Sequence, residues 1–309
     1  IDLILITENV TIPIRSVEFM FLLKTEDLNL KLEIVPLSTL IPHEAIISNV
    51  SQRLTMEFAN FANLHHPIII EKNNIVLDGN HRVSVFKKLG FKHIAVCRIN
   101  YFNRCVKLRY WFRLLGNMND LAILESIIHQ MGGRLDSVPT KAALIDALTK
   151  NYLSWGIQQG SCFNWVRFSR EKVSDAIESY RALEKLQNQL VREDASLEYI
   201  PCESARSEDV CEKIQPNDVI IWTPHIGKNM IVAATQVGSV FAPKTTRHLI
   251  PARPLNINIP GQWLKEDISL DDINERFTNY LTAKRIRKFG PGQVIDGRFY
   301  GETVFVFYD

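Results

Sequence analysis

The sequence contains no apolar run long enough to span a membrane, and its first residues lack the basic leader of a secretion signal. Its five cysteines are odd in number and widely spaced, without a Cys-x-x-Cys pair. This spacing argues against a disulfide framework or a zinc site. Together these absences predict a cytoplasmic protein with free thiols and no membrane partner.

Two common nucleotide-binding motifs are also absent, because the chain has neither Gly-x-x-x-x-Gly-Lys-Ser/Thr nor Gly-x-Gly-x-x-Gly. The net charge of +2 and the scattered basic residues give no electrostatic argument for binding nucleic acid. What the chain does have is an ordinary composition, 46% hydrophobic and 23% charged over 309 residues. That length suits one large domain or two of ordinary size.

Polar residues gather where a predicted strand gives way to a predicted helix. Residues 75–77 indicate a short strand, and Val83, Phe86 and Leu89 then recur at helical spacing. Residues 78–82 therefore occupy the junction, where a helix offers free backbone N–H groups and the positive end of its dipole to an anion.

The five junction residues are Asp78, Gly79, Asn80, His81 and Arg82. Gly79 lets a ligand approach the backbone closely, and Arg82 can bind a phosphate. Asp78 can hold a metal ion. From these residues alone, an ordinary Asp-Gly turn followed by a polar helix start is an equal alternative.

A compact α/β unit is predicted around this junction. Strict alternation in residues 28–35 indicates a half-buried strand, and residues 48–64 indicate a helix. A proline-bounded loop between them carries Glu44. Ser51 and Arg53 lie in the first turn of the predicted helix and form a second possible anion site.

Beyond this unit the pattern changes. Residues 107–115 are expected to begin a helix, and residues 117–193 are expected to be mostly helical. Strands are expected at residues 218–222 and 230–234. A proline-led loop at residues 243–248 then concentrates two cations, two hydroxyls and an imidazole. Taken alone, this loop is more typical of a solvated connection than of a site.

The ordered motifs resemble the core of the ParB/sulfiredoxin superfamily and, within it, the free L-serine kinases of archaea and of a staphylococcal siderophore pathway. The resemblance covers roughly residues 30–112 and 216–265. It rests on Leu37-Ser38-Thr39-Leu40-Ile41-Pro42-His43-Glu44, His66-Pro67-Ile68-Ile69, Leu77-Asp78-Gly79-Asn80-His81-Arg82, Tyr101-Phe102 leading to Trp111, and Lys244-Thr245-Thr246-Arg247-His248 with Ile250-Pro251 and Arg253-Pro254.

The same motifs separate the branches of that superfamily. Sulfiredoxins need a reactive cysteine directly before the His-Arg pair, and Asn80 occupies that place here. Chromosome-partition proteins carry a Gly-Glu-Arg-Arg type motif and a helix-turn-helix module, whereas this chain has Gly-Asn-His-Arg and no clear basic recognition helix. A sulfinate-reducing or DNA-binding role is therefore disfavoured.

The serine-kinase resemblance implies roles for the residues of the α/β unit. It implies that Glu44 is the base for the serine hydroxyl and that Asp78 holds Mg²⁺ or assists that hydroxyl. An ordinary solvated carboxylate is the alternative for Glu44. Phosphates of ATP or ADP would be bound by Gly79, Asn80, His81 and Arg82, with Ser51 and Arg53 as weaker candidates.

The resemblance also implies a substrate-binding role for the later loop. Thr246, Arg247 and His248, together with Lys244 and Thr245, would receive the serine carboxylate or the transferred phosphoryl group. Trp111 would form a wall of the pocket, although a core tryptophan is an equal alternative.

These observations predict an α/β (α+β) protein with a ParB/sulfiredoxin-like core. We expect the nucleotide-binding core in residues 1–112, a helical insertion in residues 113–200 and a substrate-loop region in residues 201–309. The predicted function is nucleotide-dependent phosphorylation of free L-serine to O-phospho-L-serine. The alternative is a non-catalytic nucleotide-binding regulatory or DNA-associated protein on the same core.

Overall fold

The structure, a computed structural model, describes residues 10–11, 20–60, 63–118, 121–202 and 214–309. The chain divides into two compact units. Unit 1 combines Ile1–Lys107 with His248–Asp309, and unit 2 consists of Leu108–Arg247. The chain leaves unit 1 in β8 (Lys107–Arg109) and returns in β15 (Arg247–Leu249). Within the described ranges, no helix is both long and apolar enough to cross a membrane.

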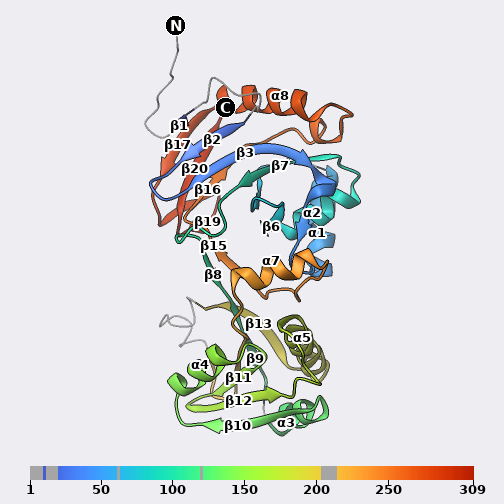
Figure 1. The fold of residues 1–309 in the computed structure, drawn as a ribbon, viewed down its shortest axis with the longest axis vertical. Helices are drawn as coiled ribbons and strands as arrows, with labels where there is room; N and C mark the ends of the chain where they lie inside the picture. Colours follow the sequence, from blue (N-terminus) through green and yellow to red (C-terminus); the bar gives the residue numbers. More distant parts are fainter. Residues whose placement is uncertain (1–9, 12–19, 61–62, 119–120, 203–213) are drawn as a thin grey trace. The chain divides into compact units, whose positions relative to one another are not determined.

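Unit 1 contains a seven-stranded mixed sheet built from the first hundred residues (Figure 1). Its strand order is β1-β2-β3-β7-β5-β6-β4. The strands are β1 (Val10–Thr11), β2 (Phe21–Lys24), β3 (Asn29–Pro36), β4 (Ile41–Pro42), β5 (Ile68–Ile70), β6 (Ile75–Asp78) and β7 (His93–Arg98).

Two helices, α1 (Ser48–Asn60) and α2 (Asn80–Lys88), pack together in unit 1. The strand-to-helix junction at residues 78–82 is thus confirmed, and the helix predicted at residues 48–64 is confirmed over Ser48–Asn60. Residues 61–62 lie outside the described part, and Leu64 forms a β-bridge with Ile259 instead. Phe58 of α1 meets Phe86 of α2 edge-on, with ring centroids 4.8 Å apart. This aromatic contact fixes α1 beside the helix that begins at the junction.

The C-terminal segment completes unit 1, so that the blue and red ends of the chain share one unit in Figure 1. Strand β20 runs between β16 and β17 in a three-stranded sheet, and β18 and β19 form a hairpin. The elements are β16 (Ala252–Leu255), α8 (Leu270–Thr282), β17 (Arg285–Phe289), β18 (Gln293–Ile295), β19 (Arg298–Tyr300) and β20 (Thr303–Tyr308), with short 3-10 turns at Leu37–Thr39 and Trp263–Lys265.

Helix α8 packs on β3 and is joined to it by a side-chain amide. Asn274 accepts a hydrogen bond from the Ile34 N–H at 2.7 Å and donates one to the Ile34 carbonyl at 2.8 Å. Ser269 caps the helix by accepting from the Asp272 N–H at 3.1 Å. The buried face of α8 thereby covers the strand that leads to the His43 loop.

Unit 2 is built on a six-stranded antiparallel sheet with the order β10-β12-β11-β14-β9-β13. Its strands are β9 (Trp111–Gly116), β10 (Gly133–Val138), β11 (Trp155–Gln159), β12 (Cys162–Phe168), β13 (Ser196–Pro201) and β14 (Val219–Trp222). Its helices are α3 (Leu121–Gln130), α4 (Lys141–Lys150), α5 (Ala176–Arg192) and α7 (Lys228–Gln236).

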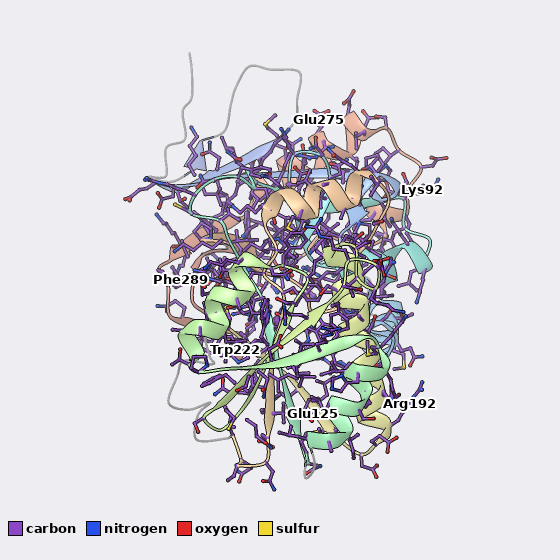
Figure 2. All side chains as sticks on the ribbon, turned by 60° about the horizontal axis from the view of Figure 1, so that its bottom comes forward. Lys92, Glu125, Arg192, Trp222, Glu275 and Phe289 are labelled. Carbon is purple, nitrogen blue, oxygen red and sulfur yellow. The ribbon has the colours of Figure 1, made fainter. Side chains whose placement is uncertain are left out.

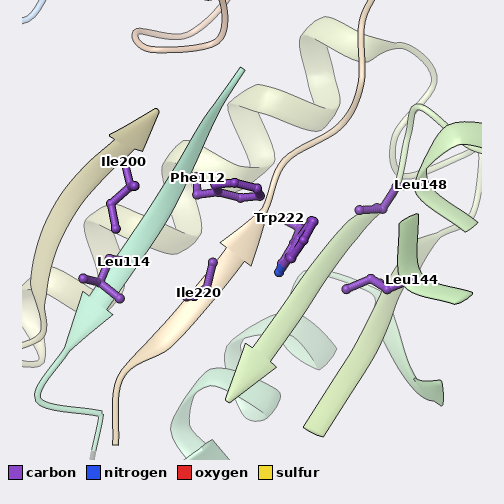
Figure 3. Packing of buried hydrophobic residues seen from close by; sticks show 7 residues of the cluster. All are labelled: Phe112, Leu114, Leu144, Leu148, Ile200, Ile220 and Trp222. Atoms are coloured by element: carbon purple, nitrogen blue, oxygen red, sulfur yellow. The ribbon is translucent and has the colours of Figure 1, made fainter. Parts of the chain in front are cut away.

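Apolar side chains of the sheet and α4 form the core of unit 2. Figure 3 shows Leu144 and Leu148 of α4 beside Trp222 at the end of β14. Phe112 of β9 meets the Trp222 ring edge-on at 4.6 Å. In Figure 2, Trp222 lies among closely spaced side chains, whereas the exposed Arg192 extends away from the ribbon.

Three sequence expectations are wrong. Residues 107–115 contain strands β8 and β9 rather than a helix, and residues 117–193 contain three strands as well as helices. The apolar run of a central strand lacks the period-2 pattern that would distinguish it from a buried helix. Residues 230–234 belong to helix α7, whose buried Ile231 and Ala234 are three residues apart on one helical face.

The two units also differ from the expected division at residues 112 and 200. Strands β13 and β14 pair with β9 on its two sides, so residues on both sides of position 200 share one sheet. The expected separate C-terminal part is therefore divided between the units. The α/β class itself, with mixed sheets and packed helices, is confirmed.

Candidate functional site

The junction between β6 and α2 depends on a glycine. Gly79 has φ 109°, in the left-handed region, and it caps the start of α2. A Cβ atom at this position would lie 2.6 Å from the Ile68 Cδ1 atom. Because any larger residue would meet both a steric clash and an unfavourable φ, the close packing of Ile68 and Arg82 at the start of α2 requires glycine here.

Asp78, the last residue of β6, faces two guanidinium groups. Arg253 of β16 donates from Nη1 to the Asp78 Oδ2 atom at 3.0 Å, and Arg82 Nη2 lies 3.8 Å from the same oxygen. Arg253 also pairs with Glu302. Burial would raise the pKa of Asp78, but the charges of Arg253, Arg82 and Arg298 outweigh it and lower this pKa to about 2. Asp78 is therefore ionised across the physiological range.

Arg82 ties the start of α2 to the loop before β5. Its Nη1 atom donates to the His66 carbonyl at 2.7 Å and lies 3.4 Å from the Pro67 carbonyl. His66 in turn accepts at Nδ1 from the Asn256 N–H at 3.1 Å. The guanidinium predicted to bind phosphate thus already holds three segments of unit 1 together.

A pocket of about 420 Å³ opens in unit 1 beside these arginines. Arg82, Arg253 and Arg298 line it on the polar side, and Leu54 and Phe58 of α1 contribute apolar surface. Arg298 comes from the β18–β19 hairpin, whose turn residues Asp296 and Gly297 both have positive φ. The pocket is large enough for a molecule of nucleotide size, whereas free serine would fill only a fraction of it.

His43 is buried at the other side of the junction. Its Nδ1–H donates to the Val76 carbonyl at 2.5 Å, and its Nε2 atom lies 3.8 Å from the Glu44 Oε1 atom. Burial lowers the pKa of His43, although the Glu44 charge and the Val76 hydrogen bond oppose this shift. A neutral His43 with its proton on Nδ1 presents Nε2 on the Glu44 side.

His248 packs against His43 and joins the later loop to this cluster. The two rings meet edge-on with centroids 5.2 Å apart. The Tyr101 hydroxyl lies 2.9 Å from the His248 Nε2 atom. His43, Glu44, Tyr101 and His248 therefore form one contiguous group in unit 1, which we call the histidine cluster. None of its four described side chains lines the 420 Å³ pocket.

Asn80 and His81 are the first residues of α2, between the pocket and the histidine cluster. The His81 Nε2 atom accepts from the Ile47 N–H at 3.0 Å and so fixes the loop after Glu44. One end of the Asn80 amide lies 3.5 Å from the His43 Nδ1 atom. The oxygen of the same amide is buried without a hydrogen-bond partner among the described residues.

Ser51 and Arg53, the weaker phosphate candidates, lie on α1 and not at the start of α2. Ser51 is buried, and its hydroxyl lies 3.5 Å from Nζ of Lys88 in the last turn of α2. Arg53 is exposed on α1. The structure therefore places Ser51 at the opposite end of α2 from Gly79, which weakens its case as a phosphate ligand.

In unit 2, two cationic side chains of the predicted substrate loop lie over a tryptophan ring. The Lys244 Nζ atom lies 4.4 Å, and the Arg247 Cζ atom 5.0 Å, from the centroid of the Trp111 ring. Trp111 donates from Nε1 to the Thr246 carbonyl at 2.9 Å. Thr245 is buried, and its hydroxyl donates to the Ala242 carbonyl at 2.7 Å, which makes it a residue that shapes the loop.

Asp78, the expected Mg²⁺ ligand, is not part of a candidate metal site among the described residues. Within the described residues, no three His, Cys, Asp or Glu side chains come together as a candidate metal site. The Asp78 carboxylate is already paired with Arg253 and Arg82, so a cation there would compete with two guanidinium groups. Asp78 as a Mg²⁺ ligand stays a prediction, and no step below depends on it.

Sequence reasoning missed several residues of this region. Arg298 and Asp296 lie in a hairpin that carried no motif, and Arg253 was noticed only as part of the family resemblance. The roles of Tyr101 and His66 depend on contacts with His248 and Asn256, which are 147 and 190 residues away in the chain. No local sequence pattern predicts a contact between residues so far apart in the chain.

Comparisons with known proteins bear on this arrangement. No protein-family model matches the chain. An ATP-dependent L-serine kinase from Staphylothermus marinus is 24% identical over 75% of this chain and 90% of its own. An ADP-dependent L-serine kinase from Thermococcus kodakarensis is 20% identical over 80% of this chain and 93% of its own. A ParB-like protein from Sulfolobus acidocaldarius is 34% identical over 28% of this chain and 44% of its own.

Solved structures agree in fold. A free serine kinase in complex with AMP superposes with a TM-score of 0.61 at 20% identity, covering 75% of this chain and 93% of that one. SbnI from Staphylococcus aureus, truncated at its C-terminus, superposes with a TM-score of 0.64 at 17% identity, covering 81% and 95%. These matches confirm the predicted resemblance to the ParB-like superfamily and to the free serine kinases within it.

Proposed function

We propose that this protein is a nucleotide-dependent kinase that phosphorylates the hydroxyl of free L-serine to give O-phospho-L-serine. The observation that carries the proposal is the β6–α2 junction, where the glycine-capped start of α2 adjoins both a nucleotide-sized pocket and a carboxylate next to a buried histidine. The L-serine kinases that this chain resembles support the choice of acceptor. The AMP complex of a similar fold supports a nucleotide donor.

The nucleotide phosphates bind at the start of α2 in this proposal. The first N–H groups of a helix and the positive end of its dipole stabilise an anion, and Gly79 supplies the left-handed conformation in which α2 begins. The nucleoside then extends into the adjoining pocket, where Leu54 and Phe58 offer apolar contact. Arg298 is the pocket arginine that does not pair with Asp78, so it is available to a phosphate.

The transfer itself needs a base and an in-line arrangement. Glu44 takes the proton of the serine hydroxyl as the oxygen forms a bond to the terminal phosphorus, while the bond from that phosphorus to the bridging oxygen breaks. General-base catalysis of this kind contributes on the order of 10²–10⁴ in rate. Phosphoryl transfer needs little further covalent work, because positioning and charge stabilisation supply most of the acceleration.

The serine carboxylate and ammonium need partners beyond the base. We assign the carboxylate to Arg247, because a guanidinium binds carboxylates through two parallel hydrogen bonds. Arg247 directly precedes His248 of the histidine cluster in the chain. Lys244 and Trp111, which contact each other, form the remainder of the proposed substrate loop.

The decisive experiment is a product assay. Purified protein is incubated with Mg²⁺, with either ATP or ADP, and with a panel of hydroxyl-bearing amino acids, and phosphorylated products are identified by mass spectrometry. The proposal expects O-phospho-L-serine and a nucleotide shortened by one phosphate in equal amounts. Comparing the two nucleotides decides the donor, which the ATP- and ADP-dependent relatives leave open.

A non-catalytic nucleotide-binding regulator on the same core is the second candidate. The match to a ParB-like protein over 88 residues favours it. The net charge of +2 does not favour a DNA-associated role. Stable nucleotide occupancy in the presence of serine, with no product from any amino acid of the panel, would support this candidate and overturn the kinase.

A further inference from the structure

Tyr101 is a buried member of the histidine cluster, although no proposed catalytic step uses it. The residue is 1% exposed, and its ring lies 5.3 Å from the His248 ring, centroid to centroid. Its hydroxyl lies 2.9 Å from the His248 Nε2 atom. A tyrosine that only filled space would not need to aim its hydroxyl at a titratable ring nitrogen.

The hydroxyl keeps its proton at every pH of interest. Burial raises the pKa of Tyr101, and the negative charge of Glu71 raises it further. A buried O–H group is a donor that needs an acceptor, and Nε2 of a neutral imidazole is one. When Nε2 accepts, the single proton of the neutral ring must sit on Nδ1.

The orientation of His248 matters because of what the ring contacts. His248 meets His43 edge-on, and the His43 Nε2 atom lies 3.8 Å from the Glu44 carboxylate. His248 also follows Arg247 in the chain, so the position of its ring is coupled to the end of the substrate loop. A hydrogen bond from the buried Tyr101 hydroxyl to Nε2 fixes both the plane and the tautomer of the His248 ring.

We propose that Tyr101 is a positioning residue, which donates its hydroxyl proton to the His248 Nε2 atom and thereby holds His248 in the Nδ1–H tautomer for binding of the serine substrate. The effect on catalysis rests on the proposed kinase function, whereas the tautomer itself does not. Tyr101 does not touch the reacting atoms and acts through His248.

The test uses Tyr101→Phe, which removes one oxygen and retains the ring. Nitrogen-15 NMR of the imidazoles in the full-length protein reports which nitrogen of His248 carries the proton, with His248→Gln used to assign the signals. The unmodified protein should show His248 protonated at Nδ1. In Tyr101→Phe the Nε2–H form, which an isolated neutral imidazole favours, should become populated. An unchanged tautomer in the variant, or an Nε2–H ring in the unmodified protein, would overturn the proposal.

A control at a half-buried tyrosine separates this effect from the loss of any tyrosine hydroxyl that donates within unit 1. Tyr280 in unit 1 donates its hydroxyl to the Asn258 carbonyl at 2.8 Å. Tyr280→Phe should therefore leave the His248 signals unchanged. If it shifts them as Tyr101→Phe does, the effect is a general loosening of unit 1 and the positioning role is refuted.

Kinetics then test the link to the reaction. Tyr101→Phe should lower kcat/KM for serine by roughly two- to tenfold, the range that one neutral hydrogen bond supplies. The same substitution made in a His248→Ala protein should have no further effect, because Tyr101 acts only through His248. An equal loss in both backgrounds would refute the proposal. An enzyme without serine turnover but with the expected tautomer change would refute the kinase function alone.

Discussion

Arg253 Nη1 donates a hydrogen bond to Asp78 Oδ2 at 3.0 Å, across 175 residues of sequence. The contact joins the end of β6 to β16, and Glu302 holds the same guanidinium from the other side. The start of α2 is therefore fixed by the C-terminal segment as well as by its own strand. An ion pair in this position keeps the carboxylate of Asp78 charged and defines one wall of the nucleotide-sized pocket.

Glu44→Gln should abolish serine phosphorylation while nucleotide affinity stays nearly unchanged. The two side chains are nearly isosteric, so the substitution removes basicity and charge but little volume. Loss of a general base lowers kcat by on the order of 10²–10⁴. Steady-state kinetics and calorimetric titration with nucleotide measure the two effects separately. A variant with near-normal kcat would show that another group takes the proton.

Arg298→Ala should weaken the binding of ATP or ADP about tenfold or more, because a hydrogen bond to a charged group contributes ~1.5–3 kcal/mol. Adenosine, which carries no phosphate, should bind the variant and the unmodified protein equally. The guanidinium lies 5.0 Å from the Tyr300 ring and is exposed, so its removal should leave the melting temperature nearly constant.

Phe299→Ala is the control for this prediction. Phe299 is the next residue of the same strand, is 66% exposed and does not line the pocket. Nucleotide affinity should therefore survive its truncation. Equal losses in both variants would mean that the hairpin acts through its conformation, and unchanged affinity in Arg298→Ala would place the phosphates elsewhere.

Arg247→Ala should raise KM for serine roughly ten- to a hundredfold and change nucleotide affinity little, because a guanidinium–carboxylate contact typically contributes about 1.5–3 kcal/mol. Ethanolamine lacks the carboxylate, so it should already be a poor substrate and should be unaffected by the substitution. Steady-state kinetics with both compounds decide the matter. Normal handling of serine by the variant, or a preference for ethanolamine, would remove Arg247 from the substrate site.

His66 should make the protein less stable as the pH falls from about 6.5 to about 4. Burial, followed by the charges of Arg82 and His65, lowers the pKa of His66 from 6.5 to about 4. In that interval the unfolded chain binds a proton that the folded chain does not, so the free energy of unfolding decreases with falling pH. Above the unfolded pKa this contribution is fully present.

Urea unfolding at the two ends of this interval measures the effect, which is at most ~3 kcal/mol because each pKa unit corresponds to about 1.4 kcal/mol. His66→Asn keeps an acceptor for the Asn256 N–H and removes the titrating ring. Its unfolding free energy should vary less with pH than that of the unmodified protein. An identical pH dependence in both proteins would exclude His66 as the source.

Sequence reasoning predicted the region around the junction well because its signals are local. Alternation identified β3, helical spacing identified α1 and α2, and the glycine between Asp78 and Asn80 identified the start of α2. Lys244, Arg247 and Trp111 were predicted to act together, and they do lie in contact. Their role in binding serine stays a prediction.

The errors arose where tertiary context decides the structure. Strand β9 is central in its sheet, so four successive buried residues conceal the alternation that identifies a strand. The Asp78–Arg253 pair and the Tyr101–His248 contact link residues more than a hundred positions apart. Ion-pair geometry of this kind also converts the predicted metal ligand Asp78 into a partner of arginines, which composition alone does not reveal.

The division of unit 1 between both ends of the chain has a consequence for biosynthesis. Asp78 leaves the ribosome long before Arg253 and Glu302 exist, and β3 emerges long before the amide of Asn274 that binds it. Unit 2, a continuous segment, can fold while the C-terminal segment is still being made. The nascent chain therefore carries an incomplete pocket until its C-terminal segment is released, and a ribosome that stops early yields a chain without the Asp78–Arg253 ion pair.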